Sequence, residues 1–311
     1  MTIGLSRHLN DRLEKVVSEV GSVLIGKRHQ IRLALCCLLA RGHLLIEDLP
    51  GMGKTTLAHG LASALDLSFK RLQFTSDLLP SDILGISIYD RENEGFRFHP
   101  GPVFTQLLLA DEINRTTPKT QSALLEAMAE GQVTIDGESR ALPEPFFVIA
   151  TQNPASQRGT YPLPESQQDR FAMCISLGYP DSDAEKQILL GAGNRRDAAS
   201  LDSCLSTVEL LELQQEAQRI HVSESLAEYV LRLVQFTRGV DGSSAGLSPR
   251  ASLVLLGCAR AWALLEGRNY VIPEDVQTVF PAVARHRLHD HGGAGKGGAV
   301  VQRALNDVDI V

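Results

Sequence analysis

The chain of 311 residues lacks several features that define particular protein classes. It has no apolar run of about 18 residues, so we expect no membrane-spanning helix. Its first residues do not resemble a signal peptide, and it shows no internal repeat or low-complexity tract. Its five cysteines have neither metal-ligand nor disulfide spacing, so we expect buried, reduced thiols in a cytoplasmic protein. They are Cys36, Cys37, Cys174, Cys204 and Cys258.

Basic charge is also scarce. The chain has 37 acidic and 30 basic residues, and its formal net charge is −7. No basic tail or stripe of basic and aromatic residues is present, so we expect no nucleic-acid partner, although a basic lining in the pore of an assembly stays open. The apolar content of 43% is ordinary for a soluble protein with a real core, and the length predicts two domains.

The strongest local pattern lies at Gly42–Thr56. An apolar run, His43–Ile46, predicts a buried strand, and Lys54–Ala64 predicts a helix. Backbone N–H groups of a tight glycine turn and of a helix start converge on an anion. A strand, a glycine turn, a lysine, a hydroxyl and a helix in this order predict a phosphate-binding loop; the alternative is a capped turn without a ligand.

Individual residues of this loop have distinct expected roles. Gly51 and Gly53 let the backbone turn and come close to a phosphate, because they have no Cβ. Lys54 would add positive charge at the outer phosphates, and the Thr55 hydroxyl would bind Mg²⁺. Asp48 stands where the strict motif has its first glycine, which weakens the motif taken alone.

Further apolar runs predict the other strands of one parallel sheet, at residues 68–74, 107–110, 146–150 and 171–177. Ligands bind at the carboxyl ends of such strands. We therefore expect Asp111 to hold the magnesium shell, Glu112 to polarise the attacking water, and Asn153 to hold that water or the γ-phosphate. A helix cap and a turn asparagine are the alternatives.

Arg170 directly precedes the last of these strands. In a parallel sheet it would lie at the amino end, opposite the nucleotide of its own subunit. It could then reach the nucleotide of a neighbouring subunit, as an arginine finger does in a ring. An ordinary surface ion pair is the alternative.

Two segments interrupt the sheet and a helical region follows it. The first is a predicted hairpin formed by residues 86–89 and 95–99. The second is a predicted hairpin formed by residues 132–135 and 139–142, with its turn at Asp136–Gly137. Beyond a linker at 179–181, helical patterns predict a second domain. They occupy residues 183–190, 208–220, 223–237, 248–266 and 273–288.

Arg250 would lie in the first turn of one of these helices, after Ser248 as N-cap and Pro249 at the first position. The helix dipole disfavours a cation there, which indicates a nearby anion such as phosphate; a solvent-facing arginine is the alternative. Upstream of the loop, helices are predicted at 5–20 and 28–40. Ile25 and Gly26 between them could contact adenine, or could simply connect the two helices.

Several motifs occur in order along the chain: GMGKT, LLLADEIN, ATQNP, LPESQQDRF and LSPRA. This set resembles the MoxR family of AAA+ ATPases over residues 5–288, a family in which aspartate at position 48 is usual. The resemblance implies an α/β P-loop AAA+ core with a parallel five-stranded sheet over 1–178 and a smaller all-α lid over 179–311. It makes 85–101 the helix-two insert and 132–142 the hairpin before sensor one.

The resemblance also implies residue roles. Lys54 and Thr55 would belong to the Walker A loop and Asp111 and Glu112 to Walker B, while Asn153 would be sensor one. Arg170 would be the trans-acting finger and Arg250 sensor two, acting in cis or in trans. The nucleotide-binding set would comprise Ile25, Gly26, Asp48, Leu49, Pro50, Gly51, Met52, Gly53, Lys54, Thr55 and Thr56.

The implied function is ATP hydrolysis with Mg²⁺ that drives chaperone-like remodelling or maturation of a protein client, including metal-cofactor insertion. The resemblance implies a hexameric ring and a partner with a von Willebrand factor A domain. The alternatives are a nucleic-acid-dependent motor of the same superfamily and a nucleotide-binding scaffold without turnover. A GTPase and a small-molecule kinase are disfavoured, because neither a guanine signature nor a substrate lid is present. The histidines His286, His289 and His291 would lie in a surface turn, with metal binding as the alternative.

Overall fold

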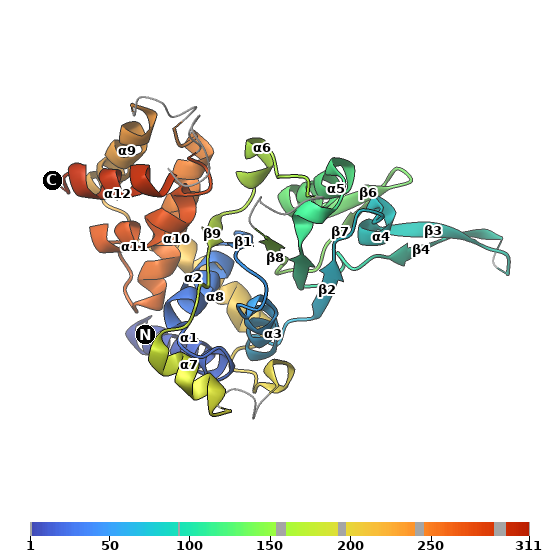
Figure 1. The fold of residues 1–311 in the computed structure, drawn as a ribbon, viewed down its shortest axis with the longest axis horizontal. Coiled ribbons are helices and arrows are strands. Elements are labelled where there is room, and N and C mark those ends of the chain that lie inside the picture. The colour runs from blue at the N-terminus through green and yellow to red at the C-terminus, as the bar shows by residue number, and fades with distance from the viewer. Residues whose placement is uncertain are drawn as a thin grey trace.

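A parallel five-stranded sheet forms the centre of the first half of the chain (Figure 1). The computed structural model describes residues 2–92, 94–153, 160–191, 197–239, 246–288 and 297–310. The strand order is β2-β5-β8-β1-β9, and all four pairings are parallel. The strands are β1 (Leu44–Glu47), β2 (Phe69–Gln73), β5 (Leu107–Asp111), β8 (Phe147–Gln152) and β9 (Met173–Ile175).

The sheet separates two hydrophobic cores, because successive side chains of a strand point to opposite faces. In β5, Leu107 and Leu109 enter the larger core, whereas Leu108 and Ala110 enter the smaller one. The strands β1 and β8 alternate in the same way. Apolar runs without polar interruptions are therefore buried on both faces, as the sequence predicts for central parallel strands.

Helices cover both faces of the sheet. The larger core lies under α1 (Thr2–Val23), α2 (Arg28–Leu39) and α3 (Lys54–Ala64). The smaller core lies under α4 (Pro80–Leu84) and α5 (Pro118–Glu130). The helix α5 begins after Thr117 and ends before Gly131, whose left-handed backbone stops the helix.

The helices of the second half pack onto the larger core (Figure 1). Ser206, Ser223 and Ser248 accept hydrogen bonds from backbone N–H groups and begin α8, α9 and α10. The last helix, α12, was not predicted. The helices are α7 (Ser182–Leu189), α8 (Thr207–Arg219), α9 (Glu224–Arg238), α10 (Pro249–Leu265), α11 (Pro273–Ala284) and α12 (Gly297–Asp307). Short elements are α6 (Glu165–Gln168), η1 (Ile113–Arg115) and η2 (Ala198–Ser200).

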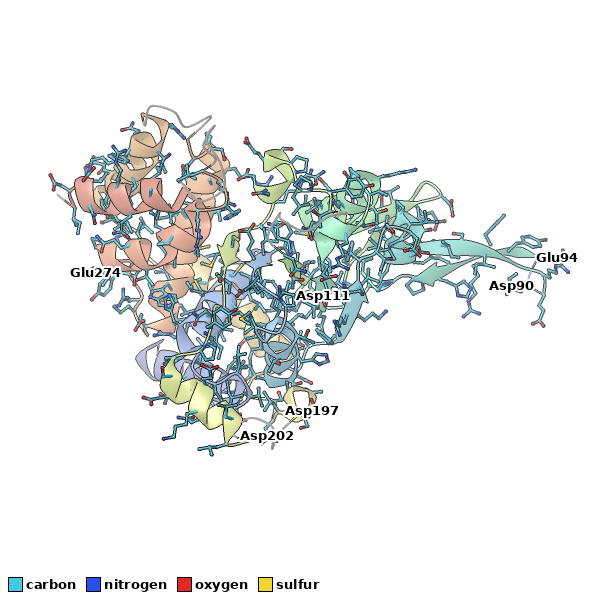
Figure 2. The ribbon with its side chains drawn as sticks, viewed as in Figure 1. Asp90, Glu94, Asp111, Asp197, Asp202 and Glu274 are labelled. Atoms are coloured by element: carbon cyan, nitrogen blue, oxygen red, sulfur yellow. The ribbon has the colours of Figure 1, made fainter. Side chains whose placement is uncertain are left out.

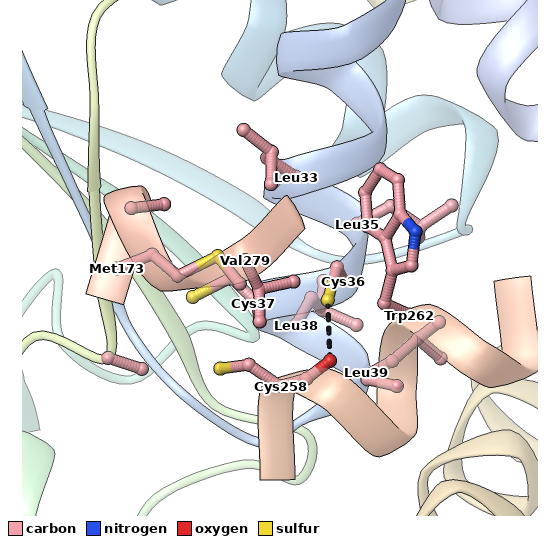
Figure 3. Close-up of a cluster of buried hydrophobic side chains, with 14 of the residues drawn as sticks. Leu33, Leu35, Cys36, Cys37, Leu38, Leu39, Met173, Cys258, Trp262 and Val279 are labelled. Atoms are coloured by element: carbon pink, nitrogen blue, oxygen red, sulfur yellow. Dashed lines mark hydrogen bonds between the residues drawn. The ribbon is translucent and has the colours of Figure 1, made fainter. Parts of the chain in front are cut away.

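The contact between the two halves is apolar and continuous (Figure 3). Leu35, Cys36 and Leu38 of α2 meet α10, where Cys36 Sγ donates a hydrogen bond to the carbonyl of Cys258 over 3.2 Å. Burial raises the pKa of the Cys258 thiol to about 12. All five cysteines are buried and form no disulfide, as predicted. Because the two halves share one core, a domain boundary at residue 178 stays a prediction.

Both predicted hairpins are confirmed. They are β3 (Gly85–Asp90) with β4 (Gly95–Pro100), which projects far from the body, and β6 (Gln132–Ile135) with β7 (Glu138–Ala141) (Figure 1). At the base of the first hairpin a Cβ on Gly101 would lie 2.2 Å from the Ile83 carbonyl oxygen. Only glycine fits there, so the base of the hairpin is held tightly to the body.

One sequence prediction is wrong. His286 does not lie in a surface turn: it is 5% exposed, and its Nε2 lies 3.1 Å from the carbonyl oxygen of Phe171. His289 and His291 lie outside the described residues. No group of three or more potential metal ligands occurs within the part of the chain that the structure describes. Within the same part, no helix is both long and apolar enough to cross a membrane.

Candidate functional site

The glycine loop between β1 and α3 adopts the conformation that an anion site requires. Gly51 and Gly53 have φ values of 84° and 92°, in the left-handed region that favours glycine. Gly53 is the N-cap of α3, and a Cβ there would lie 2.6 Å from Cδ1 of Leu24. The N–H groups of Lys54, Thr55 and Thr56 belong to the first turn of α3 and have no partner within the helix. The helix start is therefore open to a phosphate.

Lys54 lies at the centre of this site and is only 9% exposed. Its Nζ donates to the backbone oxygen of Asp48 over 2.6 Å and to Asn153 Oδ1 over 3.3 Å. Burial lowers the pKa of Lys54, and the carboxylates of Asp48, Asp111 and Glu112 oppose that shift. An anion bound beside the ammonium group would oppose it in the same way.

The two carboxylates at the end of β5, those of Asp111 and Glu112, are held by residues at the end of the neighbouring strand β8. Asp111 Oδ1 accepts from the Thr151 hydroxyl over 2.7 Å, and that hydroxyl accepts from the Glu112 N–H over 2.9 Å. Glu112 has φ 58°, and its Oε1 accepts from Asn153 Nδ2 over 2.8 Å. Thr151 and Asn153 thus orient both carboxylates toward Lys54.

Sequence reasoning missed three polar residues that touch these carboxylates. Arg71 Nη2 lies 2.6 Å from Asp111 Oδ2. Gln73 Nε2 donates to Glu112 Oε2 over 2.8 Å, and Arg115 Nε lies 3.0 Å from the same oxygen. A signal was present for Gln73: it is the last polar residue of the predicted strand 68–74, and polar residues at such strand ends face the ligand edge.

A cavity of about 430 Å³ joins these groups. It is lined by Pro50, Gly51, Gly53, Lys54, Thr55, Thr56, Arg71, Gln73, Asp111, Glu112 and Asn153. Asp111 lies near the middle of the molecule, far from Asp90 and Glu94 at the hairpin tip (Figure 2). Thr55 and Asp111 offer the hard oxygen donors that Mg²⁺ prefers, so the residues present fit that ion.

A second cavity of about 530 Å³ adjoins the first and shares Gly51, Gly53 and Thr56 with it. Its lining contains more aliphatic side chains than the first, among them Ile25, Met52 and Ile188. A cavity lined by charged groups beside one that offers aliphatic side chains suits a phosphorylated ligand with a flat, less polar ring. The structure thus places Ile25 and Met52 in the wall of the second cavity.

Three predicted binding residues line neither cavity. The Asp48 carboxylate accepts hydrogen bonds from the N–H groups of Gly178 (2.7 Å) and Leu49 (2.9 Å) and from the Ser176 hydroxyl (3.2 Å). Asp48 therefore anchors the loop to the segment that follows β9. The Leu49 side chain is exposed, and Gly26 makes room for α7, since a Cβ there would lie 2.6 Å from that of Ala184.

Arg170 and Arg250 lie together on the opposite edge of the sheet. Both line a third cavity, of about 370 Å³, beside His43 and Ala172, which precede β1 and β9. Arg170 Nη1 donates to the carbonyl of Leu125 in α5 over 2.7 Å, and Arg250 is exposed in the first turn of α10. The structure thus separates the predicted residues into two groups, one at each edge.

His43 is buried beneath this third cavity. Val148 N–H donates to His43 Nδ1 over 3.1 Å, so Nε2 carries the proton and donates to the Met128 carbonyl over 3.1 Å. Burial lowers the pKa of His43 to about 4. This histidine is therefore neutral near pH 7, and the positive charge of the cavity comes from its arginines, Arg41, Arg170 and Arg250.

Comparisons with known proteins show the family of this chain. The family model described as "ATPase family associated with various cellular activities (AAA)" matches residues 43–173, and the one described as "AAA lid domain" matches residues 236–304. The chain is 44% identical over 306 residues to "Uncharacterized protein YeaC" of Bacillus subtilis, covering 97% of this chain and 96% of YeaC. It is 44% identical over 285 residues to "Chaperone MoxR1" of Mycobacterium tuberculosis, covering 89% of this chain and 75% of that protein.

The chain belongs to the MoxR family of AAA+ ATPases. A crystal structure titled as a putative ATPase from Cytophaga hutchinsonii superimposes with a TM-score of 0.89 at 38% identity, covering 98% of this chain and 97% of that one. The predicted fold class is therefore confirmed: a P-loop AAA+ core with a parallel five-stranded sheet, followed by a helical lid. The family is chaperone-like, and its members bind nucleotides.

Proposed function

We propose that this MoxR-family protein hydrolyses ATP with Mg²⁺ and uses the turnover to remodel a protein client. One observation carries the proposal: Lys54, Glu112 and Asn153 converge on one cavity at the carboxyl edge of the sheet. A phosphate site next to a fixed carboxylate is the arrangement that activates water against a phosphoryl group.

The residues that carry this reaction have distinct tasks. The N–H groups at the start of α3 and the Lys54 ammonium hold the phosphates. Thr55 and Asp111 would hold Mg²⁺, which neutralises charge on the phosphate oxygens. Glu112 accepts the proton of the attacking water, and Asn153, which already contacts Glu112 and Lys54, orients that water. Ile25 and Met52 bind the base.

The reaction is completed by a second subunit. Arg170 and Arg250 lie at the amino edge of the sheet, opposite the cavity of their own subunit. They would contact the γ-phosphate held by a neighbour, so both act in trans. An interface between two different faces repeats from subunit to subunit, and it gives a ring when the rotation between subunits closes. We propose a hexameric ring in the cytoplasm, with residues 1–178 as the nucleotide-binding domain and 179–311 as the lid.

The client side of the proposal rests on the family and on the projecting hairpin. The similar protein MoxR1 is named a chaperone. The hairpin of β3 and β4 carries exposed Tyr89 and Phe96, whose rings meet edge to face at 5.4 Å. Client maturation, metal-cofactor insertion and a partner with a von Willebrand factor A domain are parts of this proposal. The acidic net charge of −7 supports a protein client over nucleic acid.

The deciding experiment measures phosphate release by the assembled protein. Glu112→Gln keeps the shape and neutralises the carboxylate, so turnover should fall by about 100-fold or more while ATP still binds. Glu212→Gln, an exposed residue of α8, is the matched control and should be unchanged. No turnover in the assembled wild type would favour a scaffold, and stimulation by DNA but not by protein would favour a nucleic-acid motor.

A further inference from the structure

The segment Asp169–Ala172, here called the finger segment, carries Arg170 and is held by one buried arginine. Arg287 Nε donates to Asp169 Oδ1 over 2.7 Å. Its Nη2 donates to the backbone oxygens of Asp169 (3.2 Å) and Phe171 (2.6 Å). Its Nη1 donates to Ala172 O (3.2 Å) and to Val283 O. Four of the five bonds therefore end on the finger segment.

These contacts satisfy every N–H donor of the Arg287 guanidinium group. Arginine has five N–H donors in a rigid plane, and each of the five has an acceptor here. The Arg287 side chain is only 4% exposed, so an unpaired donor would carry a desolvation cost. Lysine offers three donors from a single point and cannot reproduce the pattern.

Arg287 belongs to the lid. It follows α11, whose Val279, Phe280 and Val283 are buried in the core. His286 beside it adds a further bond to the finger segment, from Nε2 to the Phe171 carbonyl oxygen. The lid helix α10, which carries Arg250, packs against α11. The lid therefore carries Arg250 directly and holds the backbone on both sides of Arg170.

We propose that Arg287 is a positioning residue, which ties the lid to the finger segment and thereby sets the position of Arg170 against the neighbour's nucleotide. This inference rests on the proposed trans role of Arg170. Displacements of about 1 Å at a reacting centre can cost about 100-fold in rate. Loss of the Arg287 contacts should therefore affect catalysis in the neighbouring subunit, whereas its own nucleotide cavity stays intact.

A purely structural role makes a different prediction. An arginine that only stabilises the lid would lower thermal stability and leave kcat per folded subunit unchanged. Arg268 offers the matched control, because it is also a lid arginine with an ion pair and a backbone hydrogen bond. It pairs with Asp275 at 2.5 Å and donates to the carbonyl oxygen of Tyr270. It has no contact with the finger segment among the described interactions.

The first measurement compares Arg287→Gln with Arg268→Gln in steady-state phosphate release by the assembled protein. Arg287→Gln should lower kcat by about 10- to 100-fold with KM for ATP within about twofold. Arg268→Gln should keep kcat within about twofold even if the melting temperature falls. Equal kcat for wild type and a folded Arg287→Gln protein would overturn the inference.

The second measurement mixes subunits. Glu112→Gln subunits are inactive in their own cavity but present an intact Arg170, so they should restore turnover in Arg287→Gln subunits. Arg170→Ala subunits should not restore it, because both variants are faulty on the same face. Rescue by Arg170→Ala subunits, or no rescue by Glu112→Gln subunits in confirmed mixed assemblies, would contradict action through Arg170.

Milder variants keep the test decisive if Arg287→Gln does not fold. Asp169→Asn removes one charged acceptor and leaves the carbonyl contacts, and Arg287→Lys retains the charge. Both should show intermediate kcat and unchanged KM, and wild-type kcat in both would reject the inference. Full phosphate release by Arg170→Ala would overturn the proposed function, and with it this inference. An inactive Arg170→Ala protein beside folded Arg287 and Asp169 variants with wild-type kcat would overturn this inference alone.

Discussion

The two edges of the sheet differ in how their functional residues are held. At the carboxyl edge, Lys54, Glu112 and Asn153 contact one another, so the cavity is organised within one subunit. At the amino edge, Arg250 is exposed and Arg170 bonds to a backbone carbonyl. The amino edge thus carries the positive charge of these two arginines near the surface of the subunit. In the proposed reaction the carboxyl edge is the binding face and the amino edge is the donating face, and heterologous assembly would join the two.

The largest expected effect concerns the binding face. Lys54→Ala removes the only ammonium group in the phosphate cavity among the described residues, so ATP affinity should fall by about 100-fold or more. Titration calorimetry with ATP measures the effect, and Lys119→Ala on the exposed surface of α5 is the control. Retained tight binding by Lys54→Ala would remove the assignment of the loop.

The next effect concerns the donating face. Arg170→Ala should leave ATP binding intact but lower kcat by about 1,000-fold, because the positive charge is missing at the neighbour's phosphate. Phosphate release and a binding isotherm, measured on the same preparation, separate the two quantities. Mixing with Glu112→Gln subunits should restore phosphate release at the shared interface. If verified mixed assemblies release no phosphate, Arg170 does not act in trans.

A smaller effect should arise at the rim of the binding face. Gln73→Leu removes one of the groups that orient Glu112, while Asn153 and Arg115 remain. We expect kcat to fall about tenfold with an unchanged KM for ATP. Steady-state kinetics beside Gln218→Leu, an exposed control on α8, provides the measurement. An unchanged kcat would show that Gln73 does not contribute to the orientation.

The smallest catalytic effect should come from restoring the strict motif. Asp48→Gly keeps the backbone oxygen that binds Lys54 but loses the three bonds to Ser176, Gly178 and Leu49. The free energy of unfolding should fall by about 1–3 kcal/mol, with ATP affinity changed little. Chemical denaturation and calorimetry together test this. A large loss of ATP affinity would indicate that the Asp48 side chain contacts the ligand.

Much of this arrangement could be predicted from the sequence, for identifiable reasons. Unbroken apolar runs are buried on both faces, so the central strands were found. Polar residues at the ends of those runs, Asp111, Glu112 and Asn153, could then be placed at one edge. The amino-end position of Arg170 followed from the parallel direction alone.

Other features depend on contacts that local patterns do not encode. Whether Arg250 faces its own cavity depends on how the lid packs, which the structure settles by placing it beside Arg170. His286 was predicted at the surface, because nothing in the local sequence indicates that a distant carbonyl covers it. Arg287 was overlooked for the same reason. The helix α12 begins in glycines, which weaken any helical pattern.

The brevity of β9 has a consequence for communication around the proposed ring. This strand has three residues, and the bonds of Asp48 grip the chain just after it while Arg170 lies just before it. In the proposed ring, a shift of the loop on nucleotide binding would be transmitted through this short stretch of backbone to Arg170. Binding in one subunit would thereby affect hydrolysis in the next subunit, in one direction around the ring.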